Sequence, residues 1–359
     1  MHTTTDVAVV GGGIIGAAIA WRLAAEGVAV TLVDPAPGLG ATHAAAGMLA
    51  PVTELHYGEE RLLRLNLSSA RRYPDFVAGL GVDVGYRQTG TVVAAWDAAD
   101  LAALRDLAQL HHSLGLSSQL LTARELRALE PAASPGLPGG LFAADDHAVD
   151  PRRLHQALTA TATIEPQAVA SVGNSAVTLA DGSTLRAGNV VIAAGARAGH
   201  IEGVPPIATA GLRPVKGQTL RLRSARPVID HVLRGSVRGT PVYLVPRDDG
   251  EIVVGASSEE AGYDERPRAG AVYDLLRDAQ LLLPAVLEME LVEVSTGLRP
   301  ATPTNAPVIG AVGDGLIVAI GHYRNGVLLA PITADAVAEL ILHDRTLPEV
   351  ADFAVEVPA

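Results

Sequence analysis

The chain has 359 residues, 48% of them hydrophobic, and a formal net charge of −12. This composition excludes a disordered protein and argues against a groove that binds nucleic acid, which needs a basic stripe. The chain has no cysteine, which excludes disulfides, thiolate metal sites, iron–sulfur clusters and thiol catalysis. Lys216 is the only lysine, so we expect no lysine base or Schiff base. The sequence shows no unbroken run of eighteen apolar residues, and we expect no membrane span and no metal site.

The first 34 residues predict a strand, a helix and a second strand. Val7–Val10 is a short β-branched run without polar alternation, as in a strand buried on both faces. Ile14–Glu26 follows as a helix, and Val28–Val33 as a second buried strand that ends in Asp34. The apolar runs on both sides argue against a Gly-rich surface loop, and four central glycines, an acid on each side and the lack of a basic n-region argue against a signal peptide or membrane anchor.

Gly11, Gly13 and Gly16 give the G-x-G-x-x-G spacing between the first strand and the helix. The first glycine permits a tight turn, the second lets the backbone approach a pyrophosphate, and the third allows the helix to pack closely. Asp34, eighteen residues after Gly16, is placed to accept hydrogen bonds from a ribose. The sequence therefore predicts a dinucleotide site at the helix N-terminus.

Residues 35–51 are rich in Gly and Ala and contain Thr42 and His43. Such a segment suits a surface pressed against a large flat ligand, although a flexible loop explains the composition equally well. Periodicity, capping residues and turn chemistry predict the remaining elements. The predicted helices are 59–80, 97–114, a short one after Thr122, 151–162, 271–282 and 327–342. The predicted strands are 82–95 (as two), 169–172, 177–179, 184–186, 189–196, 218–222, 228–233, 242–245, 252–255, 288–298, 307–310 and 316–321.

These elements predict two domains of different class. The first is an α/β, Rossmann-like nucleotide-binding domain that is discontinuous in sequence, comprising 1–85, 147–212 and 293–359. The second is an α+β substrate-binding domain with an antiparallel sheet, comprising 86–146 and 213–292.

Three residues are candidates for binding a small substrate that carries a carboxylate. Arg299 ends a long apolar strand, where a guanidinium needs an anionic partner and matches a carboxylate bidentately. The hydroxyl of Tyr243 is placed to donate to the same group, and Arg324 is a second candidate in a loop before a helix. For each, a structural ion pair or a surface position is the alternative.

The motifs together resemble a known family over the whole chain. They are the fingerprint with Asp34, the run Ala44-Ala-Ala-Gly-Met-Leu-Ala-Pro51, Gly139-Gly-Leu-Phe142 with Asp150-Pro151, Gly297-Leu-Arg-Pro300, and Gly321-His-Tyr-Arg-Asn-Gly326. The chain resembles the FAD-dependent D-amino-acid oxidase family, and within it the ThiO-like glycine oxidases of thiamine biosynthesis. The resemblance implies non-covalent FAD in a glutathione-reductase-type domain, a cytoplasmic homotetramer, and a functional link to thiazole synthase.

The resemblance also assigns roles to individual residues. Arg299 anchors the substrate carboxylate with Tyr243 as helper, and Arg324 lies beside them. Ser258, Met48, His322 and Tyr323 line the substrate pocket. The implied FAD contacts are Gly11, Gly13, Ile14, Ile15, Gly16, Asp34, Thr42, His43, Ala45, Ala46, Gly47, Met48, Val169 (adenine), Ala194, Gly195, Arg299, His322, Arg324, Asn325, Gly326, Val327 and Leu328.

The implied reaction is oxidation of glycine, and of sarcosine or small D-amino acids, to an imine with O₂ reduced to H₂O₂. Hydride transfer from Cα to flavin N5 then depends mainly on positioning and needs no protein base. Two residues depart from the family pattern. His43 stands where relatives have a hydroxyl or tryptophan, and Ser258 replaces a bulkier residue, which leaves strict glycine preference open.

Three alternatives remain. The first is a D-amino-acid, sarcosine or proline dehydrogenase that passes electrons to an acceptor other than oxygen. A nicotinamide-dependent dehydrogenase shares the fingerprint but leaves the C-terminal return to the cofactor unexplained. An RNA-modifying flavoenzyme is disfavoured by the acidic charge.

Overall fold

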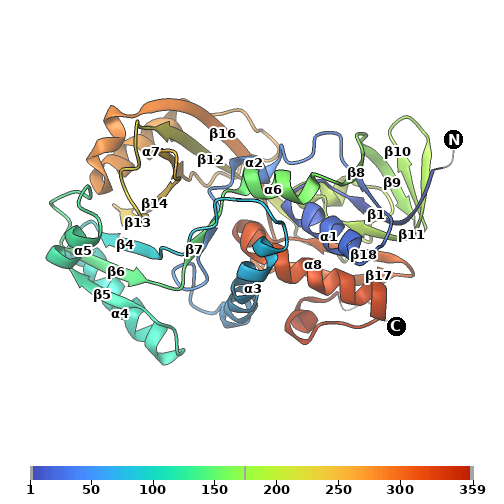
Figure 1. Ribbon diagram of the computed structural model, residues 1–359, viewed down its shortest axis with the longest axis horizontal. Coiled ribbons are helices and arrows are strands. Elements are labelled where there is room, and N and C mark those ends of the chain that lie inside the picture. Colours follow the sequence, from blue (N-terminus) through green and yellow to red (C-terminus); the bar gives the residue numbers. More distant parts are fainter. Residues whose placement is uncertain (1–2, 174, 356–359) are drawn as a thin grey trace.

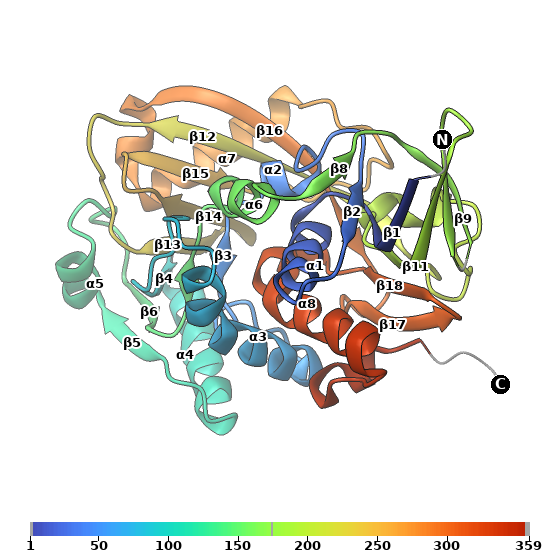
Figure 2. The same cartoon turned by 45° about the vertical axis from the view of Figure 1, so that its right-hand side comes forward.

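Two large sheets organise the protein, seen at the two ends of the molecule in Figure 1. The computed structural model describes residues 3–173 and 175–355. A short pair, β3 (Met48–Leu49) with β7 (His147–Ala148), lies between the sheets. Figure 2 shows the same arrangement from a second direction.

The first sheet has the strand order β17-β18-β11-β1-β2-β8. Its central strand β1 (Thr3–Val10) runs parallel to β2 on one side and to β11 on the other, so the strand order reverses at β1. Strands β8 and β18 are also parallel, whereas β17, β10 and β9 are antiparallel to their neighbours. The bounds are β2 (Val30–Val33), β8 (Thr163–Glu165), β9 (Val169–Gly173), β10 (Ala176–Leu179), β11 (Thr184–Ile192), β17 (Val308–Gly313) and β18 (Leu316–Ile320).

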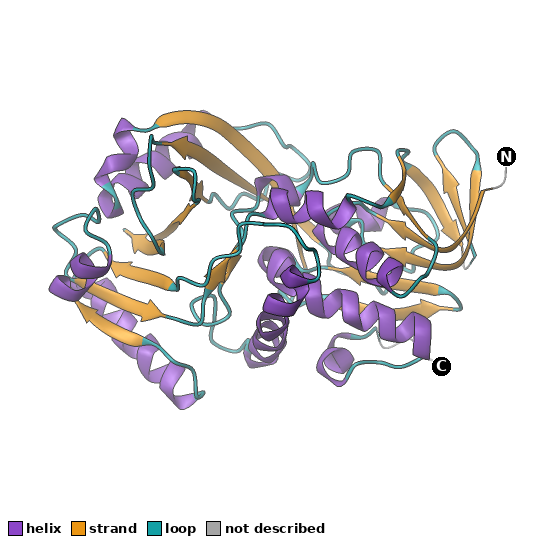
Figure 3. Cartoon of the chain, viewed as in Figure 1, coloured by secondary structure: helices purple, strands orange, loops and turns teal. Residues whose placement is uncertain are grey.

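Helices from both ends of the sequence cover this sheet. Helix α1 (Ile14–Ala25) lies beside α8 (Gly326–His343), and α3 (Glu60–Ala78) packs against α8 from the other side (Figures 1 and 3). Ile19 and Leu23 of α1 are completely buried, and each contributes about 1.5–3 kcal/mol to folding by leaving water. Residues 323–343 are long and apolar enough to cross a membrane, but 61% of their most apolar stretch is buried inside the protein. Helix α8 therefore packs as a core helix.

The second sheet has the order β16-β12-β15-β14-β13-β4-β6-β5 and is antiparallel except between β13 and β4. Helix α7 (Ala269–Leu282) packs on this sheet, with Leu275, Ala279 and Leu282 buried against it. Helices α4 (Ala98–Ser113) and α5 (Ala123–Leu129) cover its other end. The strands are β4 (Thr91–Ala95), β5 (Gln119–Thr122), β6 (Gly139–Ala143), β12 (Arg213–Arg223), β13 (Val232–Val237), β14 (Thr240–Pro246), β15 (Glu251–Gly255) and β16 (Glu290–Ala301).

Short helices complete the fold and place loops around the junction. Helix α2 (Ala41–Ala44) packs on β16, where Gly297 has no side chain to keep it away. Helix α6 (Pro151–Thr159) packs on α1 and begins at Asp150, whose carboxylate caps it. The 3₁₀ helices are η1 (Gly195–His200), η2 (Pro284–Glu288), η3 (Tyr323–Asn325) and η4 (Pro348–Phe353).

Most predicted elements are present, and the structure differs from the prediction in three places. Predicted strands 184–186 and 189–196 are one strand, β11, because β1 pairs with it in parallel from Leu185 to Ile192 without a break, while β10 pairs with its other edge at 184–186. Residues 82–88 form no strand and make only an isolated bridge at Arg87. Predicted strand 228–233 lies later, at β13. Residue 293, a predicted domain boundary, lies within β16, which pairs with β12 from Glu290 to Ala301; the division into domains stays a prediction.

Candidate active site

The glycine loop follows β1 at the reversal point of the first sheet. Gly11 has φ 107°, and a Cβ there would lie 2.5 Å from the carbonyl oxygen of Ala193. A Cβ on Gly16 would overlap the carbonyl of Gly11. Both positions therefore need glycine for the protein's own packing.

Gly13 is different, because the space that a side chain would occupy there is open. A Cβ there would meet only Thr42 Oγ1, at 3.4 Å. Gly13 is also the N-cap of α1, where the first N–H groups have no partners inside the helix. The Thr42 hydroxyl oxygen accepts a hydrogen bond from one of these groups, the N–H of Ile14, at 2.9 Å. This open, electropositive helix end fits a pyrophosphate, the anion of a dinucleotide such as FAD.

Asp34 and His155 hold this loop in place. The Asp34 carboxylate accepts from the N–H of Gly12 at 2.6 Å and from that of Ala36 at 2.7 Å, which leaves lone pairs on both oxygens for a ribose. His155 on α6 contacts the carbonyl of Gly12 at 2.7 Å, and burial lowers its pKa. A neutral imidazole can donate this hydrogen bond. His155 was not predicted as a site residue, since nothing in the local sequence links it to residue 12.

The Gly/Ala-rich loop of residues 35–51 lies between the two sheets, where packing and hydrogen bonds hold it in place. Gly47 has φ 83°, and a Cβ there would overlap the carbonyl of Val149. The buried Arg247 of the second sheet donates to the carbonyl of Ala46 at 2.6 Å. His43 makes its contact with Glu293 of β16, at 3.0 Å, and Arg152 binds the same carboxylate at 2.7 Å. The Arg152 guanidinium lowers the pKa of Glu293 to about 2.

Arg299 lies on β16 with its guanidinium over bare backbone. A Cβ on Gly217, in the neighbouring strand β12, would lie 2.5 Å from Nη2 and 2.6 Å from Cζ of Arg299. Arg299 Nη1 donates to the carbonyl of Ser257 at 3.1 Å. Among the described residues, no carboxylate lies within 4.0 Å of this half-buried guanidinium. The Arg299 guanidinium therefore has no carboxylate partner in the part of the chain that the structure describes.

Tyr243 on β14 lies beside this guanidinium over a second glycine. A Cβ on Gly255 would lie 2.5 Å from the ring carbon Cε2 of Tyr243. Burial raises the pKa of Tyr243, while the nearby Arg299 opposes the shift. The hydroxyl therefore stays protonated and can donate. Met48 packs with Tyr243 on the same small apolar cluster.

Arg324, by contrast, is already paired. Its Nη2 lies 3.0 Å from Glu59, and its Nε lies 3.3 Å from Glu54. Arg234 of β13 binds the other oxygen of Glu54 at 2.5 Å, and both arginines help lower the pKa of Glu54. Arg324 and Arg234 are therefore paired with Glu54 and Glu59, whereas Arg299 has no such carboxylate partner among the described residues. Glu54 and Arg234 were not predicted as site residues.

The segment before α8 contains one buried histidine. His322 Nε2 lies 3.0 Å from Thr333 Oγ1, and burial lowers the pKa of His322 to about 3. Tyr323 adopts φ 47° and lies half-buried. Asn325 is the N-cap of α8 without a side-chain capping bond, so the N–H groups of Gly326, Val327 and Leu328 begin the helix.

The remaining predicted residues lie near these groups or on the first sheet. Ser258 is exposed and follows Ser257. Ile15 lies in the first turn of α1, and Ala45 ends α2. Ala194 and Gly195 follow β11 close to the glycine loop, and Val169 begins β9. Within residues 3–173 and 175–355, no three His, Asp or Glu side chains gather as metal ligands.

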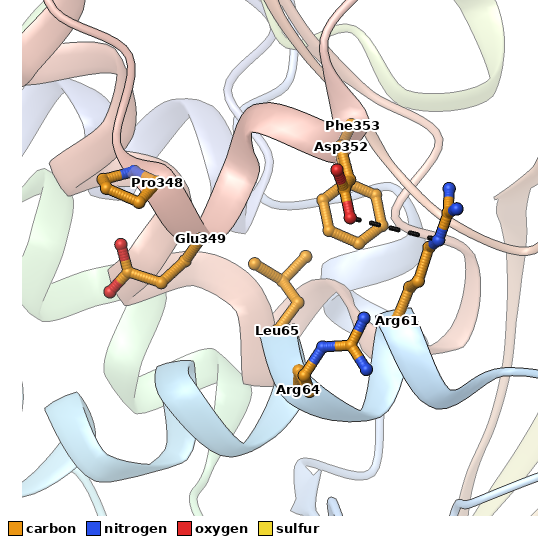
Figure 4. Close-up of a pocket in the computed structure, with 7 residues that line it drawn as sticks. All are labelled: Arg61, Arg64, Leu65, Pro348, Glu349, Asp352 and Phe353. Carbon is orange, nitrogen blue, oxygen red and sulfur yellow. Dashed lines mark ion pairs between the residues drawn. The ribbon is translucent and has the colours of Figure 1, made fainter.

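A separate cavity of about 250 Å³ lies between α3 and η4. Figure 4 shows its lining, where Arg61 and Asp352 approach to 4.0 Å. None of the predicted site residues lines it.

Comparison with known proteins places this architecture in a family. The family model described as FAD dependent oxidoreductase (DAO) matches residues 6–340. The chain belongs to this FAD-dependent oxidoreductase family. The resemblance and the fold class predicted from the sequence are thereby confirmed, and FAD is the cofactor that the glycine loop fits.

Several relatives match over nearly the whole chain. Glycine oxidase of Geobacillus kaustophilus is 32% identical, covering 98% of this chain and 96% of that protein. The crystal structure of that glycine oxidase superposes with a TM-score of 0.91 at 31% identity, covering 99% of this chain and 100% of that one. A bifunctional ThiO/ThiG protein of Synechocystis sp. is 34% identical over 98% of this chain, but the chain spans only 54% of that relative.

Proposed function

We propose that this member of the family oxidises glycine, and small amino acids close to it, to the imine with reduction of O₂ to H₂O₂. The observation that carries the proposal is the unpaired Arg299 guanidinium, held over Gly217 and next to the protonated Tyr243 hydroxyl. A small amino acid supplies the missing carboxylate. The similarity to glycine oxidases supports glycine as the substrate.

Arg299 and Tyr243 bind and orient the substrate in this proposal. The guanidinium takes the carboxylate bidentately, and the phenol donates a further hydrogen bond. Fixing that end of a two-carbon molecule also fixes its Cα–H bond, so catalysis is largely a positioning effect. FAD, when bound, accepts the hydride and passes the electrons to oxygen.

A dedicated protein base is not required by this arrangement. Glu54 and Glu59 are neutralised by arginines, and His322 is buried as a neutral ring against Thr333. A neutral substrate amine supplies the electron pair that forms the imine. Arg324 is proposed to orient Glu54 and shape the pocket, with its charge already paired.

The cofactor is proposed to lie between the glycine loop and the second sheet. Gly13, Ile14 and Thr42 would hold the pyrophosphate, and Asp34 the ribose. Helix α8 would direct its N-terminal dipole toward reduced flavin, where it stabilises negative charge. With His43 engaged by Glu293, we propose that FAD is held without a covalent bond.

Substrate range and electron acceptor are tested together. The purified protein would be assayed for H₂O₂ and keto acid with glycine, sarcosine, D-alanine and D-proline, with and without a dye acceptor. Yellow protein that forms glyoxylate and H₂O₂ from glycine is the expected result. Turnover only with dye would instead support a D-amino-acid, sarcosine or proline dehydrogenase, and colourless protein that binds NADH would refute the proposal.

The biological setting is proposed from the relatives. Because some relatives are named bifunctional ThiO/ThiG proteins, we propose a functional link in which the imine of glycine supplies a thiazole synthase. We further propose that the enzyme is cytoplasmic and that it is a homotetramer. Sedimentation of the holoenzyme would test the oligomeric state.

A further inference from the structure

We propose that the buried Lys216 and its partner Glu259 act as a positioning pair that holds the Arg299 guanidinium ready for the substrate carboxylate. This inference rests on the proposed function, in which Arg299 is the anchor for that carboxylate. Neither residue touches the substrate in this account.

Lys216 lies on β12 immediately before Gly217, so strand alternation places its side chain on the opposite face from the site. It is 0% exposed. Its Nζ donates to the carbonyl of Arg266 at 2.6 Å and lies 3.5 Å from the Glu259 carboxylate. An ammonium in such a place is costly unless its partners compensate for the lost water. The Lys216 ammonium is therefore held by the Arg266 carbonyl and the Glu259 carboxylate, which both lie in the loop between β15 and α7.

Glu259 connects the lysine to the loop that follows β15. Its Oε1 accepts from Gln218 Nε2 and from Ser257 Oγ, both at 2.6 Å. Lys216 and Glu259 also exchange backbone hydrogen bonds, at 3.0 and 2.9 Å. Ser257 Oγ in turn accepts from the N–H of Gln218 at 2.9 Å. The Ser257 N–H also donates to the carbonyl of Gln218 at 3.2 Å, so Ser257 is held both by its side chain and by its backbone.

Ser257 carries the restraint through to the site. Its carbonyl accepts from Arg299 Nη1 at 3.1 Å. The bare backbone of Gly217 below the guanidinium gives it little lateral restraint. When the Lys216–Glu259 pair is broken, the Ser257 carbonyl gains freedom and the guanidinium samples other rotamers. Binding of a carboxylate must then include the cost of ordering it again.

This role predicts a specific loss in carboxylate binding. In holoenzyme carrying Glu259→Gln or Lys216→Met, the Kd for acetate, read from the flavin absorption spectrum, should rise about tenfold, as should KM for glycine. The kcat should stay within about threefold, and the ratio of flavin to protein should not change. A merely structural role would lower Tm without this split between KM and kcat.

Asp278→Asn is the matched control. Asp278 is a buried carboxylate on α7 whose side chain pairs with Arg277, at 2.8 Å. We expect this variant to lose stability while its Kd for acetate stays that of wild type.

An unchanged Kd for acetate in Glu259→Gln would overturn the proposal, and that variant decides the matter if Lys216→Met does not fold. Wild-type holoenzyme that neither binds acetate nor oxidises glycine would overturn the proposed function as well. Oxidation of glycine at wild-type KM by Glu259→Gln would overturn the positioning role alone.

Discussion

The space beside Gly217 provides a direct test of where the carboxylate anchor must stand. In Gly217→Ala, the new Cβ would lie 2.5 Å from Nη2 and 2.6 Å from Cζ of Arg299. Carbon contacts favour about 3.5 Å, so the guanidinium must retreat by about 1 Å. Since it is the end of a flexible side chain, the fold should tolerate this shift.

The displaced guanidinium should bind the substrate poorly. Loss of a charge-assisted hydrogen bond costs about 1.5–3 kcal/mol, so we expect kcat/KM for glycine to fall about 10- to 100-fold, mostly through KM. The assay is initial-rate H₂O₂ formation, with Tm and flavin content measured alongside. Gly270→Ala is the control, because a Cβ there meets no atom within 4 Å. Wild-type KM in Gly217→Ala would refute the placement of the anchor.

Two further predictions concern the cofactor loop and pH. Gly13→Ala should fold with a wild-type Tm as apoprotein but retain less flavin, whereas Gly11→Ala should lower Tm because its Cβ meets the Ala193 carbonyl at 2.5 Å; equal Tm losses would contradict the distinction. Burial lowers the pKa of His322 to about 3, so between about pH 6.5 and 3 only the unfolded chain binds this proton. Stability therefore falls as the pH is lowered through this range, by up to about 1.4 kcal/mol per pH unit. Urea unfolding between pH 6 and 4 should show a shallower loss in His322→Gln, and an identical slope would show that the ring titrates in the folded state.

Local patterns predicted the elements that local physics controls. The βαβ unit follows from apolar runs and glycine spacing, and the helix after Thr122 begins with the predicted capping box. The helix at Asp150 likewise begins at its side-chain cap. The length of β11 was missed because sheet pairing, which is non-local, decides where a strand continues.

The site was predictable in its residue types but less so in its pairing. Arg299 and Arg324 look alike in sequence, yet Arg324 is paired with Glu54 and Glu59. That difference depends on contacts between residues some 270 positions apart, which no local pattern reveals. Gly217 was the available signal, because a glycine in a strand often marks a close approach.

The carboxylate claim is tested most directly by removing the carboxylate from the substrate and its partner from the protein. Anaerobic flavin reduction would be followed with glycine and with methylamine, in wild-type holoenzyme and in Arg299→Met. Since truncating one partner of a buried charge pair costs about 3–5 kcal/mol, wild type should prefer glycine by about 10²–10⁴-fold, and Arg299→Met should show almost no preference. A variant that keeps the wild-type preference for glycine would contradict the account.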